Sequence, residues 1–145
     1  MVEIAIVNRG SEFARVVALL DQFGKDHHLA PEIIADMHVA LDEVLTNITK
    51  YAYTDNAEHE IHIRFRVLDN VLEAMIEDDG KPFNPLTIPP PDISSPLRDR
   101  SVGGVGIYFV ARLMDDVAYE RQGDTNYLIL SKKINTEAGE RDGSA

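Results

Sequence analysis

Hydrophobic and polar residues alternate in several short segments, and a period of two residues is typical of strands with one buried face. The segments that we expect to be strands are 2–7, 61–67, 71–77, 116–121 and 127–134. Asp69-Asn70 separates the second and third segments and favours a tight hairpin turn. Gly123-Asp124 lies between the last two. The pattern therefore predicts five strands.

Three other segments repeat hydrophobic residues at the spacing of a helix. Ser11 is placed to cap a first helix, which we expect Gly24 to end. Pro31 opens a longer second helix at a first-turn position. Its apolar stripe has a period of about 3.6 residues and consists of Ile33, Ile34, Met37, Ala40, Leu41, Val44, Leu45 and Ile48. A short third helix is expected after Gly106.

The order of these elements predicts an α+β fold. We expect a two-layer sandwich in which a mostly antiparallel sheet of about five strands carries three helices on one face. Residues 82–96 contain six prolines, and a loop of this length often forms a lid or a binding segment. We expect residues 1–134 to form one domain and the polar residues 135–145 to be a disordered tail.

Composition and charge narrow the function classes. The chain has 145 residues and no cysteine, which excludes disulfides and cysteine-based metal sites or nucleophiles. It shows no apolar run long enough for a transmembrane helix and no signal-peptide pattern, so we expect a cytoplasmic protein that does not bind membranes. A net charge of −11 repels nucleic acid phosphates, so we expect no nucleic-acid partner.

The first candidate motif lies on the second predicted helix. Glu43 and Asn47 are four residues apart, so they share one face of that helix. We expect this face to differ from the apolar stripe. A carboxylate beside an amide can hold a magnesium ion and a proton-accepting base together. Taken alone, the pair better fits the solvated side of an amphipathic helix.

Two further motifs follow. Asp78 stands where a strand runs into a loop, where its carboxylate can accept a hydrogen bond from an adenine amino group, and Gly80 allows a flat ring to approach the backbone. Gly103, Gly104 and Gly106 precede the third helix, where free backbone N–H groups can bind phosphate oxygens. Alone, the first also fits an acidic turn and the second a flexible connector.

Together, in this order, the three motifs resemble those of the histidine-kinase-like ATPase superfamily, which has the Bergerat fold. The runs Glu-Val-Leu-Thr-Asn-Ile-Thr-Lys-Tyr-Ala-Tyr (43–53), Asp-Asp-Gly-Lys-Pro-Phe-Asn-Pro (78–85) and Gly-Gly-Val-Gly-Ile-Tyr-Phe-Val-Ala-Arg-Leu-Met-Asp (103–115) closely resemble the anti-sigma-factor serine/threonine protein kinases. The resemblance covers roughly residues 2–133.

The resemblance implies a role for each matched residue, with ATP and Mg²⁺ as cofactors. Asn47 matches the magnesium-binding asparagine, and Glu43 matches the general base four residues before it. Asp78 matches the aspartate that reads adenine, with Gly80 beside the ring.

The remaining matched residues concern the phosphates. Gly104 and Gly106 match the phosphate-binding glycines, which Gly103 extends. Arg98 and Arg100 are both candidates for the lid arginine that contacts the terminal phosphate in some members.

The match is looser in two places. The proline-rich lid departs from the family's shorter members, which affects the expected lid geometry and partner docking. In the last strand, Thr125 or Asn126 is a candidate to support the adenine site through water.

The resemblance also implies an activity and partners. The chain would phosphorylate an anti-sigma-factor antagonist, hold a sigma factor inactive and form a homodimer. A non-catalytic ATP-binding module for partner switching is the alternative. A histidine kinase would need a phosphoacceptor helix pair before the first strand, and an ATP-hydrolysing machine would need a transducer domain. We expect neither.

Overall fold

Five antiparallel strands form one sheet in the computed structural model, which describes residues 1–82 and 104–134. The strands are β1 (Val2–Val7), β2 (Glu60–Leu68), β3 (Val71–Asp78), β4 (Asp116–Gln122) and β5 (Thr125–Lys133). Their order across the sheet is β1-β2-β3-β5-β4, and every neighbouring pair is antiparallel. This order places β5 beside β3, so residues far apart in sequence become neighbours.

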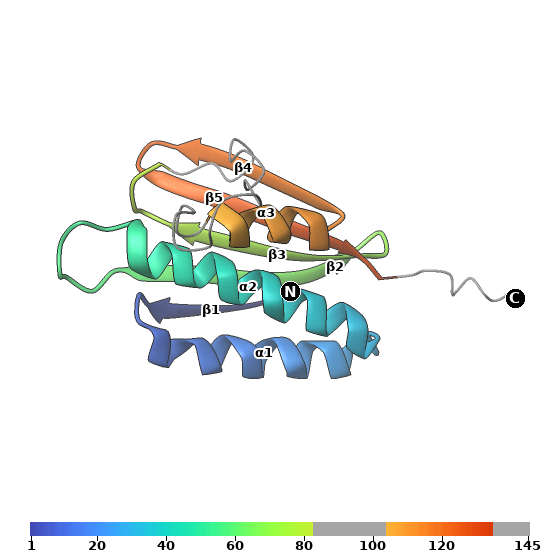
Figure 1. Cartoon of the computed structure of the whole chain (residues 1–145). Helices are drawn as coiled ribbons and strands as arrows, with labels where there is room; N and C mark the ends of the chain where they lie inside the picture. Colours follow the sequence, from blue (N-terminus) through green and yellow to red (C-terminus); the bar gives the residue numbers. More distant parts are fainter. Residues whose placement is uncertain (83–103, 135–145) are drawn as a thin grey trace, which may run out of the picture.

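Helices cover one face of the sheet, as Figure 1 shows. They are the 3-10 turn η1 (Gly10–Glu12) and the α-helices α1 (Phe13–Asp26), α2 (Pro31–Tyr51) and α3 (Gly104–Leu113). The predicted α+β architecture, with five strands and three α-helices, is confirmed for the part of the chain that the structure describes. None of its helices is long and apolar enough to cross a membrane.

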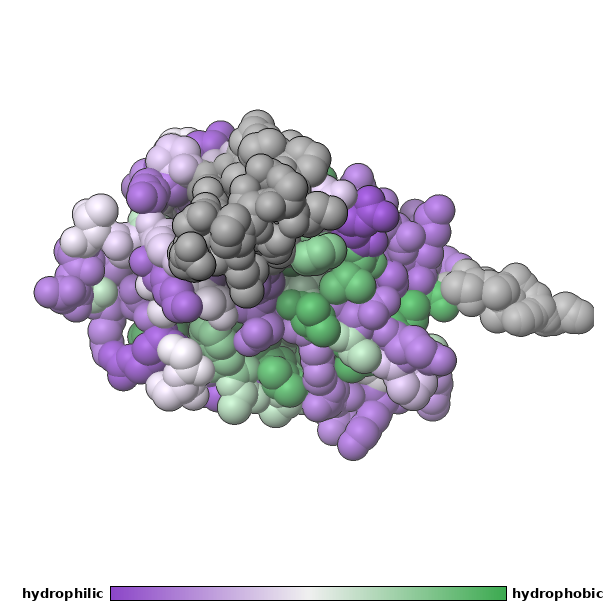
Figure 2. All heavy atoms as spheres, in the orientation of Figure 1, coloured by the Kyte–Doolittle hydropathy of each residue, from purple (hydrophilic) through white to green (hydrophobic). Residues whose placement is uncertain are grey.

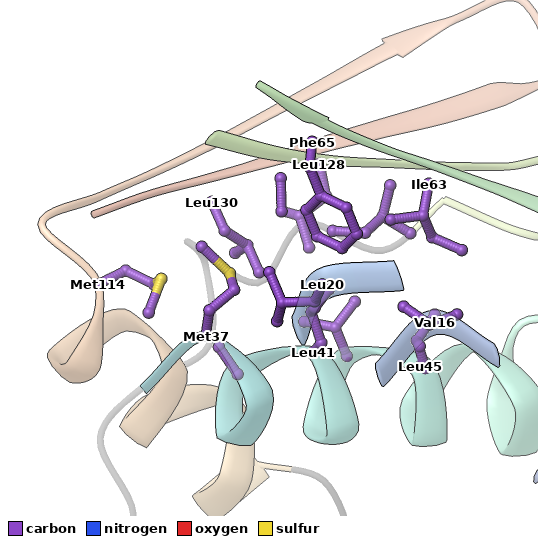
Figure 3. Packing of buried hydrophobic residues seen from close by; sticks show 14 of the residues in the cluster. Val16, Leu20, Met37, Leu41, Leu45, Ile63, Phe65, Met114, Leu128 and Leu130 are labelled. Atoms are coloured by element: carbon purple, nitrogen blue, oxygen red, sulfur yellow. The ribbon is translucent and has the colours of Figure 1, made fainter. Parts of the chain in front are cut away.

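The core lies between the helices and the sheet. Figure 3 shows Leu20 and Met37 directed toward the sheet, where Phe65 and Leu130 meet them. Alternate residues of β2 are buried while His62 and its neighbours at period two face the open side. Most of the predicted stripe of α2 is fully buried in this cluster, with Ile34 and Ile48 packed at its margin.

The start and end of α1 differ from the sequence prediction. Ser11 lies inside η1 and caps nothing; the residue before α1 is Glu12, which forms no side-chain cap. Gly24 does not end the helix but is buried within it. A Cβ at Gly24 would lie 2.7 Å from Cδ1 of Ile34. Close packing of α1 on α2 therefore accounts for this glycine.

Two other predicted boundaries also shift. α3 begins at Gly104, so Gly104 and Gly106 belong to its first turn instead of preceding it. β5 begins at Thr125, directly after the turn at Gly123, whose φ is +61°. The disordered tail predicted at 135–145 lies outside the described residues, as does nearly all of the proline-rich loop.

The helix-bearing face is largely hydrophilic, with a hydrophobic area near its middle (Figure 2). Val39 of α2 and Phe109 of α3 are among the large hydrophobic side chains that are exposed, at 56% and 51%. Exposed apolar groups of this kind are common on soluble proteins and by themselves indicate no particular partner.

Candidate functional site

The three motifs come together at one end of the molecule. α2 and β3 both end there, and α3 begins there and runs beside α2 (Figure 1). The turn after β3 touches the end of α2, because the N–H of Lys81 donates a 2.9 Å hydrogen bond to the carbonyl of Ala52. The end of α2, the turn after β3 and the start of α3 therefore share one region.

Glu43 and Asn47 form a bonded pair on α2. Asn47 is only 8% exposed, so its side is not the solvated face that the sequence pattern predicted. Its Nδ2 donates to Oε2 of Glu43 at 2.6 Å and to the carbonyl oxygen of Glu43 at 2.8 Å. Both acceptors face the amide nitrogen, which fixes the orientation of the amide.

This orientation leaves an oxygen on each side chain available. Among the described residues, none donates a hydrogen bond to Oδ1 of Asn47. Oε1 of Glu43 takes no part in the hydrogen bond between the two side chains. An amide oxygen is a hard donor of the kind that Mg²⁺ accepts alongside phosphate oxygens and water. The described residues include no group of three or more His, Asp or Glu side chains suited to a metal. The pair fits a magnesium ion shared with phosphates.

Asp78 is a buried carboxylate at the end of β3, with 7% of its surface exposed. Its Oδ1 accepts hydrogen bonds from the N–H of Gly80 at 2.8 Å and from Nδ2 of Asn126 at 3.1 Å. Burial raises the pKa of Asp78, and these two hydrogen bonds oppose the rise. In the described part of the chain no donor reaches Oδ2, which is therefore available to accept a bond from a ligand.

Gly80 is required by the end of α2. A Cβ at this position would lie 2.5 Å from Cβ of Ala52 and 2.7 Å from its carbonyl oxygen. Sequence reasoning assigned the glycine to close approach of a ligand ring. The structure adds a second reason, which is close approach of the helix end.

The structure distinguishes between the two candidates in the last strand. Asn126 is 5% exposed and bonds Asp78, whereas the hydroxyl of Thr125 donates to Asp124 at 3.2 Å. Asn126 reaches Asp78 because the register of β5 against β3 pairs these two residues.

Tyr53 and His59 also belong to this region, and sequence reasoning did not find them. The Tyr53 hydroxyl donates to Oδ1 of Asp79 at 3.0 Å, and its ring stacks on His59 with centroids 4.0 Å apart. Burial, followed by the nearby charges of Asp78 and Asp79, raises the pKa of Tyr53. The phenol therefore stays protonated and acts as a donor that holds Asp79. The only sequence signal was the position of Tyr53 at the end of the first motif.

The far end of α3 is fixed by Lys132. Its ammonium group donates to the carbonyl of Leu113 at 2.7 Å and lies 3.0 Å from Oδ2 of Asp36 on α2. A cation at the carboxyl end of a helix also interacts favourably with the helix dipole. Lys132 thus ties the carboxyl end of α3 to α2 and β5.

The other candidate residues are not all described. Gly104 and Gly106 lie in the first turn of α3, where backbone N–H groups have no partner within the helix. Gly103, Arg98 and Arg100 lie outside the described residues.

Known proteins match this chain over most of its length. A family model for the histidine kinase-like ATPase domain matches residues 8–132. The serine-protein kinase RsbW of Bacillus thuringiensis (strain Al Hakam) is 35% identical over 116 residues, which cover 77% of this chain and 71% of that protein. The RsbW of Bacillus cereus (strain AH820) is 37% identical with the same coverage.

Solved structures agree on the fold. The RsbU and RsbW domains of a Mycobacterium tuberculosis protein superpose with a TM-score of 0.62 at 12% identity, covering 92% of this chain and 33% of that one. The histidine kinase domain of a blue-light activated kinase from Erythrobacter litoralis superposes with a TM-score of 0.53 at 15% identity, covering 86% of this chain and 60% of that one. The resemblance inferred from three short motifs is thereby confirmed, and the chain belongs to the histidine kinase-like ATPase domain family and, within it, to the RsbW serine-protein kinases.

Proposed function

We propose that this kinase uses Glu43 and Asn47 to transfer the terminal phosphate of ATP to a serine or threonine of an anti-sigma-factor antagonist. The observation that supports the proposal is the hydrogen-bonded pair itself. Asn47 holds one oxygen of Glu43 and turns its own amide oxygen away from it. One helix turn thus combines a base with a ligand for a metal ion.

Asp78 and the start of α3 would bind the nucleotide. The free Oδ2 of Asp78 would accept a hydrogen bond from the adenine amino group. The N–H groups of Gly104 and Gly106, with the positive end of the helix dipole, suit phosphate oxygens. An arginine of the lid, Arg98 or Arg100, stays a prediction for the contact with the terminal phosphate.

The transfer step needs positioning and charge neutralisation more than covalent chemistry. A magnesium ion held by Asn47 and the phosphates would neutralise part of the phosphate charge. Glu43 would accept the proton of the substrate hydroxyl as that oxygen bonds to the terminal phosphorus. The bond from this phosphorus to the bridging oxygen breaks, and ADP leaves.

The protein partners are proposed from the same family membership. A phosphorylated antagonist would be released, and a sigma factor would be held inactive. The net charge of −11 suits protein partners better than nucleic acid. The homodimer implied by the resemblance also stays a proposal.

Phosphate transfer should require both Mg²⁺ and the acceptor hydroxyl. With labelled ATP, we expect label to appear on a purified candidate antagonist, and to disappear with a magnesium chelator or after replacement of the acceptor residue by alanine. The measurement is the label on the acceptor over time. ATP binding without any transfer would favour the alternative of a non-catalytic module, and acceptor-independent hydrolysis would favour an ATP-hydrolysing role.

Replacing Asp78 with asparagine should separate nucleotide affinity from stability. The oxygen Oδ2 would become an NH₂ group facing the adenine amine, so one hydrogen bond to a charged group would be lost. We therefore expect ATP affinity to fall about 100-fold, which corresponds to roughly 2.7 kcal/mol. Burial raises the pKa of Asp78 in the folded state, so its contribution to stability is lost as pH rises through that pKa. The variant should therefore unfold at a higher temperature at neutral pH without nucleotide.

Calorimetric titration with ATP and thermal unfolding of both proteins between pH 4 and 8 test this prediction. ATP affinity of the unmodified protein should decline as pH falls through the raised pKa of Asp78, whereas the asparagine variant should lose this dependence. If Asp78→Asn and the unmodified protein bind ATP with equal affinity, Asp78 does not recognise adenine.

A further inference from the structure

Side chains from the hairpin of β4 and β5 hold the turn that carries Asp78 and Gly80. Nδ2 of Asn126 lies within hydrogen-bonding distance of three acceptors: Oδ1 of Asp78 at 3.1 Å, the carbonyl of Gly80 at 3.3 Å and the carbonyl of Lys81 at 3.0 Å. An amide nitrogen has two hydrogens, so all of its donor capacity is used here. The amide therefore holds both the carboxylate and the backbone that follows it.

The opposite side of the same amide faces two donors. Oδ1 of Asn126 accepts from the Tyr119 hydroxyl at 2.6 Å and from Nη1 of Arg121 at 3.1 Å. A guanidinium group can only donate, so the oxygen of Asn126 must face Arg121 and the nitrogen must face Asp78. A flipped amide would set two donors against each other at Arg121 and two acceptors against each other at Asp78.

Arg121 also bonds the turn directly. Its Nη1 donates to the carbonyl of Gly80 at 2.6 Å, and its Nε donates to the carbonyl of Gly123 at 3.1 Å. One guanidinium thus joins the turn after β3 to the turn between β4 and β5. Its positive charge also helps to offset the effect of burial on the pKa of Asp78.

We propose that Arg121, on the edge strand β4, is a positioning residue for adenine selectivity. It fixes the orientation of the Asn126 amide, which holds Oδ1 of Asp78 and leaves Oδ2 to accept a bond from the purine amino group. The inference rests on the proposed role of Asp78 as the reader of adenine. Arg121 would therefore orient Asp78 without touching the nucleotide itself.

If Arg121 has this role, replacing it should reduce the preference for adenine over other bases without weakening nucleotide binding in general. Inosine triphosphate (ITP) has a carbonyl in place of the amino group of ATP and a hydrogen on ring N1, so it has no exocyclic amine to donate to Oδ2 of Asp78. Arg121→Met keeps the length of the side chain and removes its donors. This variant should therefore weaken ATP binding and leave ITP binding unchanged.

The experiment is calorimetric titration of each full-length variant with Mg·ATP and with Mg·ITP. We expect Arg121→Met to weaken ATP binding about tenfold, the worth of one hydrogen bond to a charged group, with ITP affinity unchanged. Arg121→Lys retains the charge and a donor and should recover most of the selectivity. Arg66→Met removes an arginine that pairs with Glu73 at 2.6 Å on the open side of β2 and should change neither affinity.

Two results would overturn the proposal. Arg121→Met could weaken ATP and ITP binding equally, which indicates a structural role alone, or it could leave both unchanged. If Arg121→Met fails to fold, Tyr119→Phe replaces it in the experiment. This variant removes the other donor to Oδ1 of Asn126 and should also lower the ratio of ATP affinity to ITP affinity. An unchanged ratio in a folded Tyr119→Phe protein would then count against the proposal.

Asp78→Asn, titrated in parallel, separates this inference from the function on which it rests. If Asp78→Asn removes the preference for ATP and Arg121→Met preserves it, Asp78 reads adenine and Arg121 does not position it. If Asp78→Asn preserves the preference, Asp78 does not read adenine, and both the adenine role and the inference about Arg121 are wrong.

Discussion

Replacing Glu43 with glutamine should abolish phosphate transfer and leave ATP binding intact. The glutamine oxygen can still accept the hydrogen bond that Nδ2 of Asn47 donates to Oε2 of Glu43. Asn47 therefore keeps its orientation, and its Oδ1 stays available to a metal ion. A neutral amide cannot accept the proton of the substrate hydroxyl, and a positioned general base contributes roughly 100- to 10,000-fold to rate. We expect transfer to fall by at least about 100-fold.

The measurement combines single-turnover phosphate transfer with a titration of Mg·ATP. Glu32→Gln is a matched control, because Glu32 is an exposed glutamate in the first turn of the same helix. It should transfer phosphate at the normal rate. Normal transfer by Glu43→Gln would show that Glu43 is not the base. A loss of ATP binding would show instead that its charge contributes to the nucleotide site.

Local sequence signals predicted most of the elements because the deciding residues act on their own neighbours. Pro31 starts α2 at its first turn. Asp69 and Asn70 adopt the positive φ values, 51° and 66°, that a tight hairpin turn requires. Each of these features depends on backbone preferences within a few residues, so the pattern alone was sufficient.

The errors arose where packing outweighs local preference. Glycine is typical of a helix end, yet Gly24 lies within α1. Ile34 of α2 occupies the space where a side chain at position 24 would lie, and this packing accounts for the glycine. Asn47 sits on what the pattern predicted to be the polar side of α2, yet only 8% of its surface is exposed. In both cases a neighbouring element, which the local pattern does not specify, determines the environment.

The support of the site could be predicted only in part, for a related reason. The resemblance offered Thr125 or Asn126 as a support acting through water, but it gave neither the direct bond of Asn126 to Asp78 nor the contact of Arg121. Asn126 lies 48 residues after Asp78, and Arg121 lies 41 residues after Gly80. They meet because β5 is inserted between β3 and β4 in the sheet. The three motifs identified the groups that we propose to face the nucleotide, whereas the bond of Arg121 to the turn after Asp78 emerges only from the strand order.

One methyl group added at Gly80 should destabilise the turn that carries Asp78. The turn after β3 is held on one side by Asn126 and Arg121 and on the other by the end of α2, through the bond from Lys81 to Ala52. In Gly80→Ala the new Cβ would meet the Ala52 carbonyl at 2.7 Å, and backbone cannot move aside as a flexible side chain can. Overpacking of this kind costs roughly 1–3 kcal/mol. We expect Tm to fall by several degrees and ATP affinity to fall with it.

Thermal unfolding and ATP titration of three variants test this prediction. Gly10→Ala adds a methyl group where no atom lies within 4 Å, so it should change neither quantity. The double variant Gly80→Ala with Ala52→Gly removes the contact at 2.5 Å between side chains but keeps the contact with the carbonyl oxygen, so it should recover stability only in part. Normal stability and ATP affinity in Gly80→Ala would mean that the turn can move away from α2. Neither the end of α2 nor close approach of the nucleotide would then require a glycine at this position.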